Sequence, residues 1–153
     1  VDKKVIIETI PKIRFEARIQ YLDKGKIQKR LNNNERLLID GCHSETSAIN
    51  LANYLRTLKV PLYGIWSMTK NKDPDIFIKK FGGLFEKIIT VTIENEPASL
   101  SNKLLFKIAK RNKFNVELAN NFNTALKKIS SKQKKIICIF GSLYLCGSVL
   151  NKN

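Results

Sequence analysis

A ten-residue stretch, RLLIDGCHSE at positions 36–45, gathers several groups that could do chemistry. Asp40, Cys42 and His43 lie close together in it, and His43 is the only histidine of the chain. A thiol beside an imidazole could act as a nucleophilic dyad. We do not expect a dyad here, because consecutive residues rarely turn their side chains toward each other. The alternative is a loop that uses these groups to bind a ligand.

Other catalytic patterns are absent from the sequence. Ser142 could complete a triad with Asp40 and His43, but the GxSxG elbow of such hydrolases is missing. Neither a GxxxxGK[ST] phosphate loop nor a GxGxxG fingerprint occurs, so the chain cannot cradle a nucleotide in either of those ways. Cys42, Cys138 and Cys146 lack metal-ligand spacing, which predicts reduced thiols and no metal site.

The composition predicts a single globular domain. The 153 residues are enough to bury a core, and 43% of them are hydrophobic. No apolar run approaches the ~20 residues that cross a bilayer, and no secretory signal is visible at the start. We therefore expect a cytoplasmic protein without a membrane partner. The sequence does not begin with Met, which hints at a piece excised from a longer chain.

The net charge is strongly positive. Lys and Arg number 28 against 13 Asp and Glu, which gives +15. Such a charge attracts anions, and a nonenzymatic basic binding module is therefore one alternative for the function. The lysines are scattered along the chain, however, and no nucleic-acid recognition motif accompanies them. We do not expect a nucleic-acid partner, and anionic small molecules would suit the charge equally well.

Short apolar runs alternate with amphipathic stretches of helical length. The predicted strands are 36–41, 61–67, 87–93, 116–119 and 135–142. Their continuous apolar character is typical of strands that are covered on both faces. The predicted helices are 45–58, 74–81, 99–111, 123–130 and 143–152. Asp73 followed by Pro74 has the residue types that favour a helix start, so Asp73 is expected to cap the second helix.

This alternation predicts a three-layer, Rossmann-like α/β domain with a mostly parallel sheet of about five to six strands flanked by helices. Ligands bind such sheets beyond the carboxyl ends of the strands, where loops 40–43 and 141–143 are expected to lie. We predict the helix starts that follow these loops on one face of the sheet, where they attract anions. Residues 1–34 are predicted to be an arm or interdomain connection packed on the sheet, and 35–153 the domain itself.

Four segments then resemble a known family in order and spacing. They are RFEARIQYL (14–22), LLIDGCHSETSAINLANYL (37–55), NKDPDIFIKKF (71–81) and GSLYLCGSVL (141–150). Together they resemble the C-terminal domain of folylpolyglutamate synthase/dihydrofolate synthase, in the Mur ligase superfamily. The family pattern is roughly W-P-G-R-L-[EQ], D-G-A-H-N-P, a K-D pair and G-S-L-Y-L-V-G. The resemblance spans about residues 13–150.

The resemblance implies an ATP-dependent ligase. In this family a folate or dihydropteroate carboxylate becomes an acyl phosphate, and the amine of L-glutamate displaces the phosphate. ATP and Mg are held mainly by an N-terminal ATPase domain, over which the C-terminal domain closes. The implied partners are thus L-glutamate, folate or dihydropteroate, and that ATPase domain. The isolated C-terminal domain is expected to be inactive, because it has no phosphate loop.

The resemblance also implies roles for individual residues, none of them catalytic in isolation. Arg18 and Asp40 match nucleotide-binding positions, and a guanidinium suits phosphate through its fixed charge and forked donors. Asp40 is expected to accept hydrogen bonds from the ribose hydroxyls or to act as the partner of Arg18. Three residues match the glutamate site or the cleft: His43, Ser142 and Tyr144. Three more have possible roles there: Lys72, Asp73 and Ser44.

The sequence departs from the family pattern at two places. Ser44-Glu45 stands where Asn-Pro is usual, and Phe15-Glu16-Ala17 stands where Trp-Pro-Gly is usual. The carboxylate of Glu45 could weaken the binding of glutamate or ATP. A degenerate pseudo-domain that keeps the fold without the site is therefore a second alternative.

Overall fold

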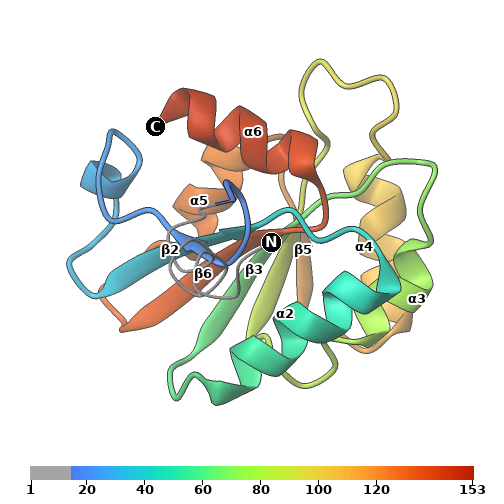
Figure 1. The fold of residues 1–153 in the computed structure, drawn as a ribbon, viewed down its shortest axis with the longest axis horizontal. Helices are drawn as coiled ribbons and strands as arrows, with labels where there is room; N and C mark the ends of the chain where they lie inside the picture. The colour runs from blue at the N-terminus through green and yellow to red at the C-terminus, as the bar shows by residue number, and fades with distance from the viewer. Residues whose placement is uncertain (1–14) are drawn as a thin grey trace, which may run out of the picture.

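The computed structural model describes residues 15–153 (Figure 1). In chain order, the elements are β1 (Gln20–Tyr21), the 3-10 helix η2 (Gln28–Arg30), β2 (Glu35–Asp40), α2 (Glu45–Thr57), β3 (Leu62–Trp66), α3 (Pro74–Lys79), β4 (Lys87–Thr90), α4 (Asn102–Arg111), β5 (Val116–Leu118), α5 (Phe122–Ile129), β6 (Lys135–Phe140) and α6 (Leu143–Lys152). Every strand and helix predicted from the sequence is present, with ends within three residues of those predicted. The prediction missed β1 and η2, which are too short to show a periodic pattern.

The strands form one six-stranded sheet in the order β1-β2-β6-β3-β4-β5. All neighbours from β2 to β5 are parallel, and only β1 pairs antiparallel, with β2. This confirms the predicted α/β fold with its mostly parallel sheet. The last strand of the chain, β6, lies between β2 and β3, and Asp40 is in register with Phe140. The loops that follow β2 and β6 therefore leave the same edge side by side.

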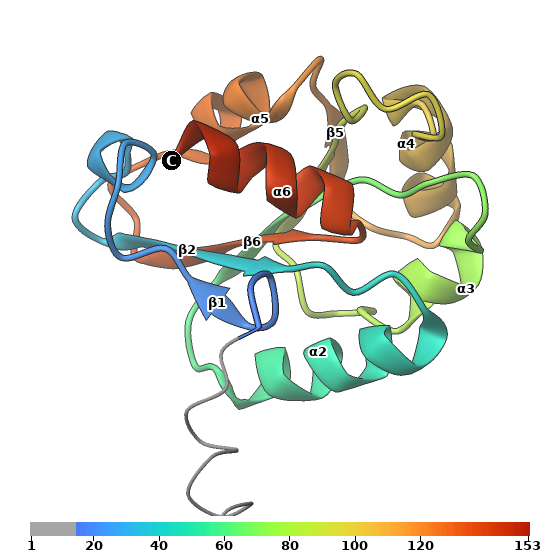
Figure 2. The same ribbon diagram turned by 45° about the horizontal axis from the view of Figure 1, so that its top comes forward.

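Helices cover both faces of the sheet. One apolar core contains residues of α2, α3 and α4, and the other contains residues of α5 and α6. Figure 2 shows α2 and α6 on opposite sides of the sheet. The prediction that both helix starts share one face is thus wrong, although they share one edge. The crossovers from β2 to β5 run one way along the sheet and the crossover from β5 to β6 runs back, so right-handed connections place α2, α3 and α4 on one face and α5 on the other. The last helix, α6, packs on the face that α5 covers.

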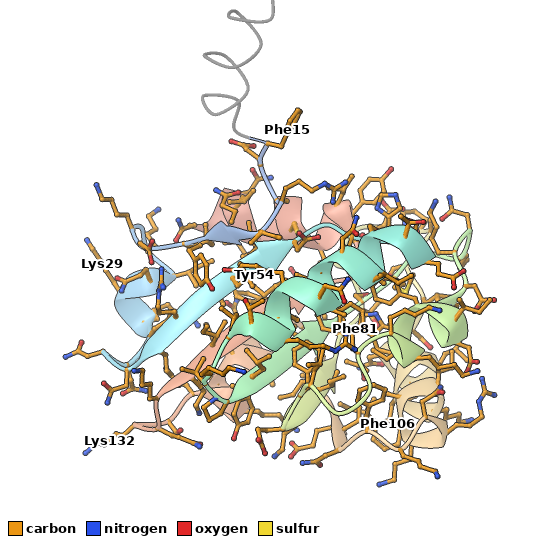
Figure 3. All side chains as sticks on the ribbon, turned by 60° about the horizontal axis from the view of Figure 1, so that its bottom comes forward. Phe15, Lys29, Tyr54, Phe81, Phe106 and Lys132 are labelled. Carbon is orange, nitrogen blue, oxygen red and sulfur yellow. The ribbon has the colours of Figure 1, made fainter. Side chains whose placement is uncertain are left out.

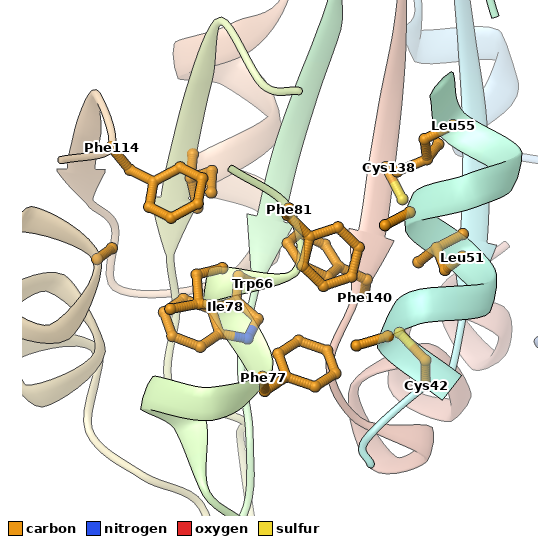
Figure 4. Packing of buried hydrophobic residues seen from close by; sticks show 14 of the residues in the cluster. Cys42, Leu51, Leu55, Trp66, Phe77, Ile78, Phe81, Phe114, Cys138 and Phe140 are labelled. Atoms are coloured by element: carbon orange, nitrogen blue, oxygen red, sulfur yellow. The ribbon is translucent and has the colours of Figure 1, made fainter. Parts of the chain in front are cut away.

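An aromatic cluster fills the core between the sheet and α3. Trp66, Phe77, Phe81 and Phe140 are all fully buried (Figure 4). Trp66 stacks on Phe77 with ring centroids 6.3 Å apart, and the ring centroids of Phe81 and Phe140 are 4.9 Å apart. Each such side chain contributes about 2–3 kcal/mol by leaving water. The cluster therefore ties the carboxyl ends of β3 and β6 rigidly to α3.

A buried ion pair lies at the opposite, amino-terminal edge of the sheet. The Glu35 carboxylate is 3.7 Å from Lys135 Nζ, and both side chains are almost fully buried. Glu35 also accepts hydrogen bonds from Asn32, Ser130 and Ser131. Burial alone would raise the pKa of Glu35, but these hydrogen bonds outweigh it and hold the pKa below its ordinary value. The pair joins the starts of the neighbouring strands β2 and β6.

The helices of residues 15–153 are short. The longest, α2, has 13 residues. None in this part of the chain combines the length and the apolar character that crossing a membrane requires.

Candidate functional site at the carboxyl edge of the sheet

The loops after β2 and β6 contact each other directly at the carboxyl edge. A Cβ atom on Gly41 would lie 2.3 Å from Cδ2 of Leu143, the first residue of α6. Leu143 therefore occupies the space that any larger residue at position 41 would need. Gly41 is the part of the loop after β2 that allows this close approach. Two of the four segments that carried the family resemblance, 37–55 and 141–150, pack together through it.

Gly141 brings the end of β3 to the same place. Its φ of +101° lies in the region that favours glycine, and a Cβ there would be 2.2 Å from the carbonyl oxygen of Ser67. The same Cβ would also be 2.6 Å from the Trp66 ring. Only glycine lets the turn after β6 pass so close to β3. Three strand ends thus meet in one compact edge.

Asp40 links the loop after β2 to the segment that precedes β1. One carboxylate oxygen accepts a hydrogen bond from the backbone N–H of Cys42 at 2.8 Å. The other accepts from the backbone N–H of Ile19 at 2.9 Å. Asp40 is only 4% exposed. The carboxylate is therefore a bridge between two backbone segments.

Arg18 stands next to this bridge. Its Nη1 atom is 3.8 Å from Asp40 Oδ1, while its side chain remains 45% exposed. An open hollow of about 290 Å³, here called the Arg18 hollow, is lined by Arg18, Ile19, Asp40, Ser47, Asn50 and Leu51. The structure thus brings the two predicted nucleotide-binding residues together. Ile19, Ser47 and Asn50 were not predicted; the three-residue spacing of Ser47 and Asn50 on a helix was the available signal.

The backbone around Arg18 has an unusual shape. Ala17 and Ile19, on either side of it, have φ angles of +54° and +43°. The N–H of Ala17 donates to Gln20 Oε1 at 2.8 Å, and the carbonyl of Ala17 accepts from the N–H of Gly41. Phe15, which starts the segment, points away from the domain and is 71% exposed (Figure 3). The turn at residues 17–19 is thus held from several sides.

A second hollow, of about 200 Å³, opens at the same edge. It is here called the His43 hollow, and its lining residues are His43, Thr69, Asn71, Lys72, Ser142, Leu143 and Tyr144. Four of the predicted site residues therefore meet in it: His43, Lys72, Ser142 and Tyr144. Thr69 and Asn71 were missed, although polar residues in the loop after a parallel strand were a usable signal. Their side chains are joined by a hydrogen bond of 2.8 Å.

The contact of His43 with a backbone carbonyl determines which ring nitrogen carries the hydrogen. Nδ1 lies 2.9 Å from the carbonyl oxygen of Gly41. A carbonyl can only accept, so Nδ1 carries the hydrogen, and in the neutral ring Nε2 is an acceptor. Beside it, Lys72 supplies a positive charge and Tyr144, 61% exposed, an aromatic wall. The hollow can therefore hold a group that both donates hydrogen bonds and carries a carboxylate.

Three of the predicted residues serve as helix caps. Ser142, 2% exposed, accepts from the N–H of Tyr144 and caps α6 while it lines the His43 hollow. Asp73 accepts from the N–H groups of Asp75 and Ile76 and caps α3, as expected from the sequence. Ser44 caps α2. Asp73 and Ser44 line neither hollow.

The departure at Glu45 has a local explanation. Its carboxylate forms an ion pair of 2.6 Å with Lys80, at the end of α3. Glu45 also stands in the first turn of α2, where the helix dipole favours a negative charge. It lines neither hollow. The extra carboxylate is therefore matched by a cation of the same domain and does not face the candidate site.

The cysteines are not placed for catalysis. Cys42, Cys138 and Cys146 are buried and free. Burial, with the nearby charge of Asp40, raises the pKa of Cys42 well above its ordinary value. The same two causes raise the pKa of Cys146 to about 12. These thiols remain protonated, and the ring of His43 binds the carbonyl of Gly41 rather than Cys42.

Comparisons with known proteins agree with this architecture. The family described as dihydrofolate synthetase, C-terminal domain, matches residues 20–152. Dihydrofolate synthetase of Saccharomyces cerevisiae is 22% identical over 165 residues, which cover 98% of this chain and 38% of that protein. Little more than a third of that relative is thus represented.

Solved structures show the same fold. Folylpolyglutamate synthase of Mycobacterium tuberculosis, complexed with ADP, has a TM-score of 0.83 at 18% identity and covers 99% of this chain and 35% of its own. A bifunctional folylpolyglutamate synthase/dihydrofolate synthase with Mn, AMPPNP and L-glutamate bound has a TM-score of 0.77 at 14% identity, and the match covers 99% of this chain and 34% of that one. The match over residues 20–152 shows that this chain belongs to the family of dihydrofolate synthetase C-terminal domains, and the solved structures share its fold.

Proposed function

We propose that this chain is the C-terminal lobe of an ATP-dependent ligase that joins L-glutamate to folate or dihydropteroate through an acyl phosphate. The observation that carries the proposal is the pair of hollows at one edge of the sheet, one offering Arg18 and the other offering His43 and Lys72. The relatives support the reaction class. One of them binds AMPPNP and L-glutamate, the two kinds of molecule that the hollows would serve.

The Arg18 hollow suits the phosphates of ATP. The guanidinium is about half exposed, and its 3.8 Å separation from Asp40 leaves its forked donors free for another anion. A fixed positive charge near the transferring phosphoryl group stabilises the charge that develops there.

The His43 hollow suits L-glutamate. Its volume of about 200 Å³ is below the roughly 300 Å³ at which pockets for drug-sized ligands begin, which favours an amino acid over a folate. Lys72 would pair with a carboxylate of the substrate. Nε2 of His43 would accept a hydrogen bond from its amine and orient that amine for attack on the acyl phosphate.

Mg²⁺ and most of the ATP contacts belong to another lobe in this proposal. Residues 15–153 contain no group of three His, Cys, Asp or Glu side chains arranged to hold a metal ion. The sequence also lacks a phosphate loop. The present lobe would close over an ATPase domain, complete the nucleotide site and keep water from the acyl phosphate.

Phosphate release that depends on ATP, glutamate and folate tests the proposal. The 153-residue chain alone should give only background, whereas the full-length protein should turn over. In the full-length protein, Arg18→Ala should reduce kcat/KM for ATP on the order of a hundredfold, because a charge on the phosphates is lost.

The control for that variant is Arg111→Ala, at the far end of α4. It removes a charge whose ion pair with Asp75 is exposed and contributes little. Turnover by the chain alone, or equal activity of the two arginine variants, would contradict the proposal.

A further inference from the structure

We infer that Ser47 is a positioning residue, whose hydroxyl holds the backbone around His43 and so directs Nε2 of that ring into the His43 hollow. The inference rests on the proposed function, because it concerns how the acceptor for the amine of L-glutamate is held. Ser47 lies outside the D-G-A-H-N-P pattern of the family resemblance, which ends at position 45.

The first step is the set of hydrogen bonds that the Ser47 hydroxyl makes. It accepts from the backbone N–H of His43 at 3.1 Å and from the backbone N–H of Ser44 at 3.0 Å. Its own hydrogen has two oxygens of Ser44 within reach, the carbonyl at 3.0 Å and Oγ at 2.9 Å. The two bound N–H groups belong to the peptide groups on either side of the Cα atom of His43. One side chain therefore holds the backbone of His43 from both sides.

The second step is the ring of His43. Nδ1 donates to the carbonyl oxygen of Gly41 at 2.9 Å, and this bond leaves Nε2 as the acceptor of the neutral ring. Hydrogen bonds weaken steeply as their geometry is lost, so the ring keeps this bond only while the Cα–Cβ direction of His43 stays fixed relative to Gly41. Gly41 is held by its close approach to Leu143. Ser47 provides the corresponding constraint on the backbone of His43.

The third step separates this role from helix capping. Ser44 and Ser47 form a capping box at the start of α2, and in such a box the later side chain binds the N–H of the capping residue. The additional bond from the N–H of His43 is not part of the box, because His43 precedes the capping residue. This bond connects the start of α2 to the candidate site.

A double-mutant cycle in the full-length protein tests the inference. Ser47→Ala should lower kcat/KM for L-glutamate by about tenfold, because the acceptor for its amine is no longer oriented. In the His43→Ala background the same substitution should change this value by less than about twofold, because nothing is left to position. Ser47 also lines the Arg18 hollow, so KM for ATP is measured in parallel and should change by less than about twofold.

Three further variants complete the test. Ser47→Thr keeps the hydroxyl and should hold kcat/KM for L-glutamate within about twofold of wild type. Ser47→Cys keeps the size of the side chain but offers only a weak acceptor, and it replaces Ser47→Ala if that variant fails to fold. Thr57→Ala is the matched control. The hydroxyl of Thr57 donates to the carbonyl of Tyr54, three residues back on the same helix, but it lines neither hollow, so its loss should leave kcat/KM unchanged.

Nuclear magnetic resonance of the imidazole gives a readout besides activity. His43 is the only histidine of the 153-residue chain, so its ring gives one pair of nitrogen signals. Under alkaline conditions, where an imidazole is neutral, the two signals should be far apart in wild type, because only Nδ1 carries hydrogen. In Ser47→Ala they should move toward each other as the ring exchanges between its two neutral forms. Ser47→Thr and Thr57→Ala should keep the wild-type spectrum.

The outcomes separate this inference from the proposed function. If His43→Ala leaves kcat/KM for L-glutamate unchanged, the proposed function of the His43 hollow fails, and the nitrogen spectra still report whether Ser47 holds the ring. If His43→Ala acts as expected but Ser47→Ala keeps its full effect in that background, Ser47 acts elsewhere and the inference is overturned. A Ser47→Ala protein that changes KM for ATP alone, or that keeps the wild-type imidazole spectrum, overturns it as well.

Discussion

At the scale of single residues, the loops at the carboxyl edge of the sheet depend on two glycines as much as on the polar side chains beside them. Gly41 leaves room for Leu143, and Gly141 lets one turn pass over the carbonyl of Ser67. Two of the residues that carry the family resemblance are therefore explained by packing alone. The polar residues next to these glycines, Asp40 and Ser142, each accept hydrogen bonds from backbone N–H groups.

Replacing Gly141 with alanine should destabilise the fold strongly. The new Cβ would overlap a backbone oxygen at 2.2 Å, and φ would stay at +101°. We expect a loss of about 3 kcal/mol or more in the free energy of unfolding, measured with urea. Gly83→Ala is the matched control, because φ is +73° there but nothing lies within 4 Å of the new Cβ. It should cost about 1 kcal/mol, and equal losses would contradict the steric explanation.

At the scale of elements, β6 organises the domain. It lies between β2 and β3, it carries the turn with Gly141 at one end, and it contributes Lys135 to the buried pair at the other. The aromatic cluster holds its carboxyl end through Phe140, and the Glu35–Lys135 pair holds its amino end. The strand that positions the site is thus anchored at both ends by different kinds of interaction.

The buried pair should make stability depend on pH. Because the pKa of folded Glu35 is lowered, its contribution is complete above the ordinary value of 4.5 and is lost as the pH falls through the lowered pKa. Glu35→Gln leaves Lys135 without its counter-charge and should cost about 3 kcal/mol near pH 7. The difference from wild type should shrink toward about pH 3 in urea unfolding.

The control for this effect is Glu86→Gln, at an exposed position with no ion pair among the described residues. It should change stability little at any pH. A cost of Glu35→Gln that stays constant between about pH 7 and about pH 3 would show that the charge of Glu35 is not the cause.

At the scale of the whole molecule, the net charge of +15 comes largely from lysines that lie outside the two hollows. Lys29 and Lys132, at the edge opposite the two hollows, both point outward into solvent (Figure 3). Charges spread in this way raise the local concentration of any polyanion without selecting one. The positive charge is therefore compatible with the proposed function, whose ligands would be anionic.

Binding to random-sequence DNA duplexes checks this interpretation. We expect weak binding at about 20 mM salt that disappears by about 150 mM, because scattered lysines contribute only screened, nonspecific attraction. Fluorescence anisotropy with labelled duplexes measures it, and Lys132→Glu should weaken it only slightly. Tight binding that survives about 150 mM salt would favour the alternative of a basic binding module.

The sequence by itself determined what depends on neighbours along the chain. Apolar runs of strand length, amphipathic stretches and the cap at Asp73 were sufficient for the α/β class and for all elements but β1 and η2, with ends within three residues, because these signals are local. The motifs, in order, were also sufficient for the family.

Only the tertiary structure decided what depends on residues far apart in the chain. It placed β6 between β2 and β3, put α2 and α6 on opposite faces, and separated the Arg18 hollow from the His43 hollow. The bond from Ile19 to Asp40 and the pair of Glu35 with Lys135 also appear only there. No local pattern encodes such contacts, because they form only when crossover direction and strand order bring distant segments together.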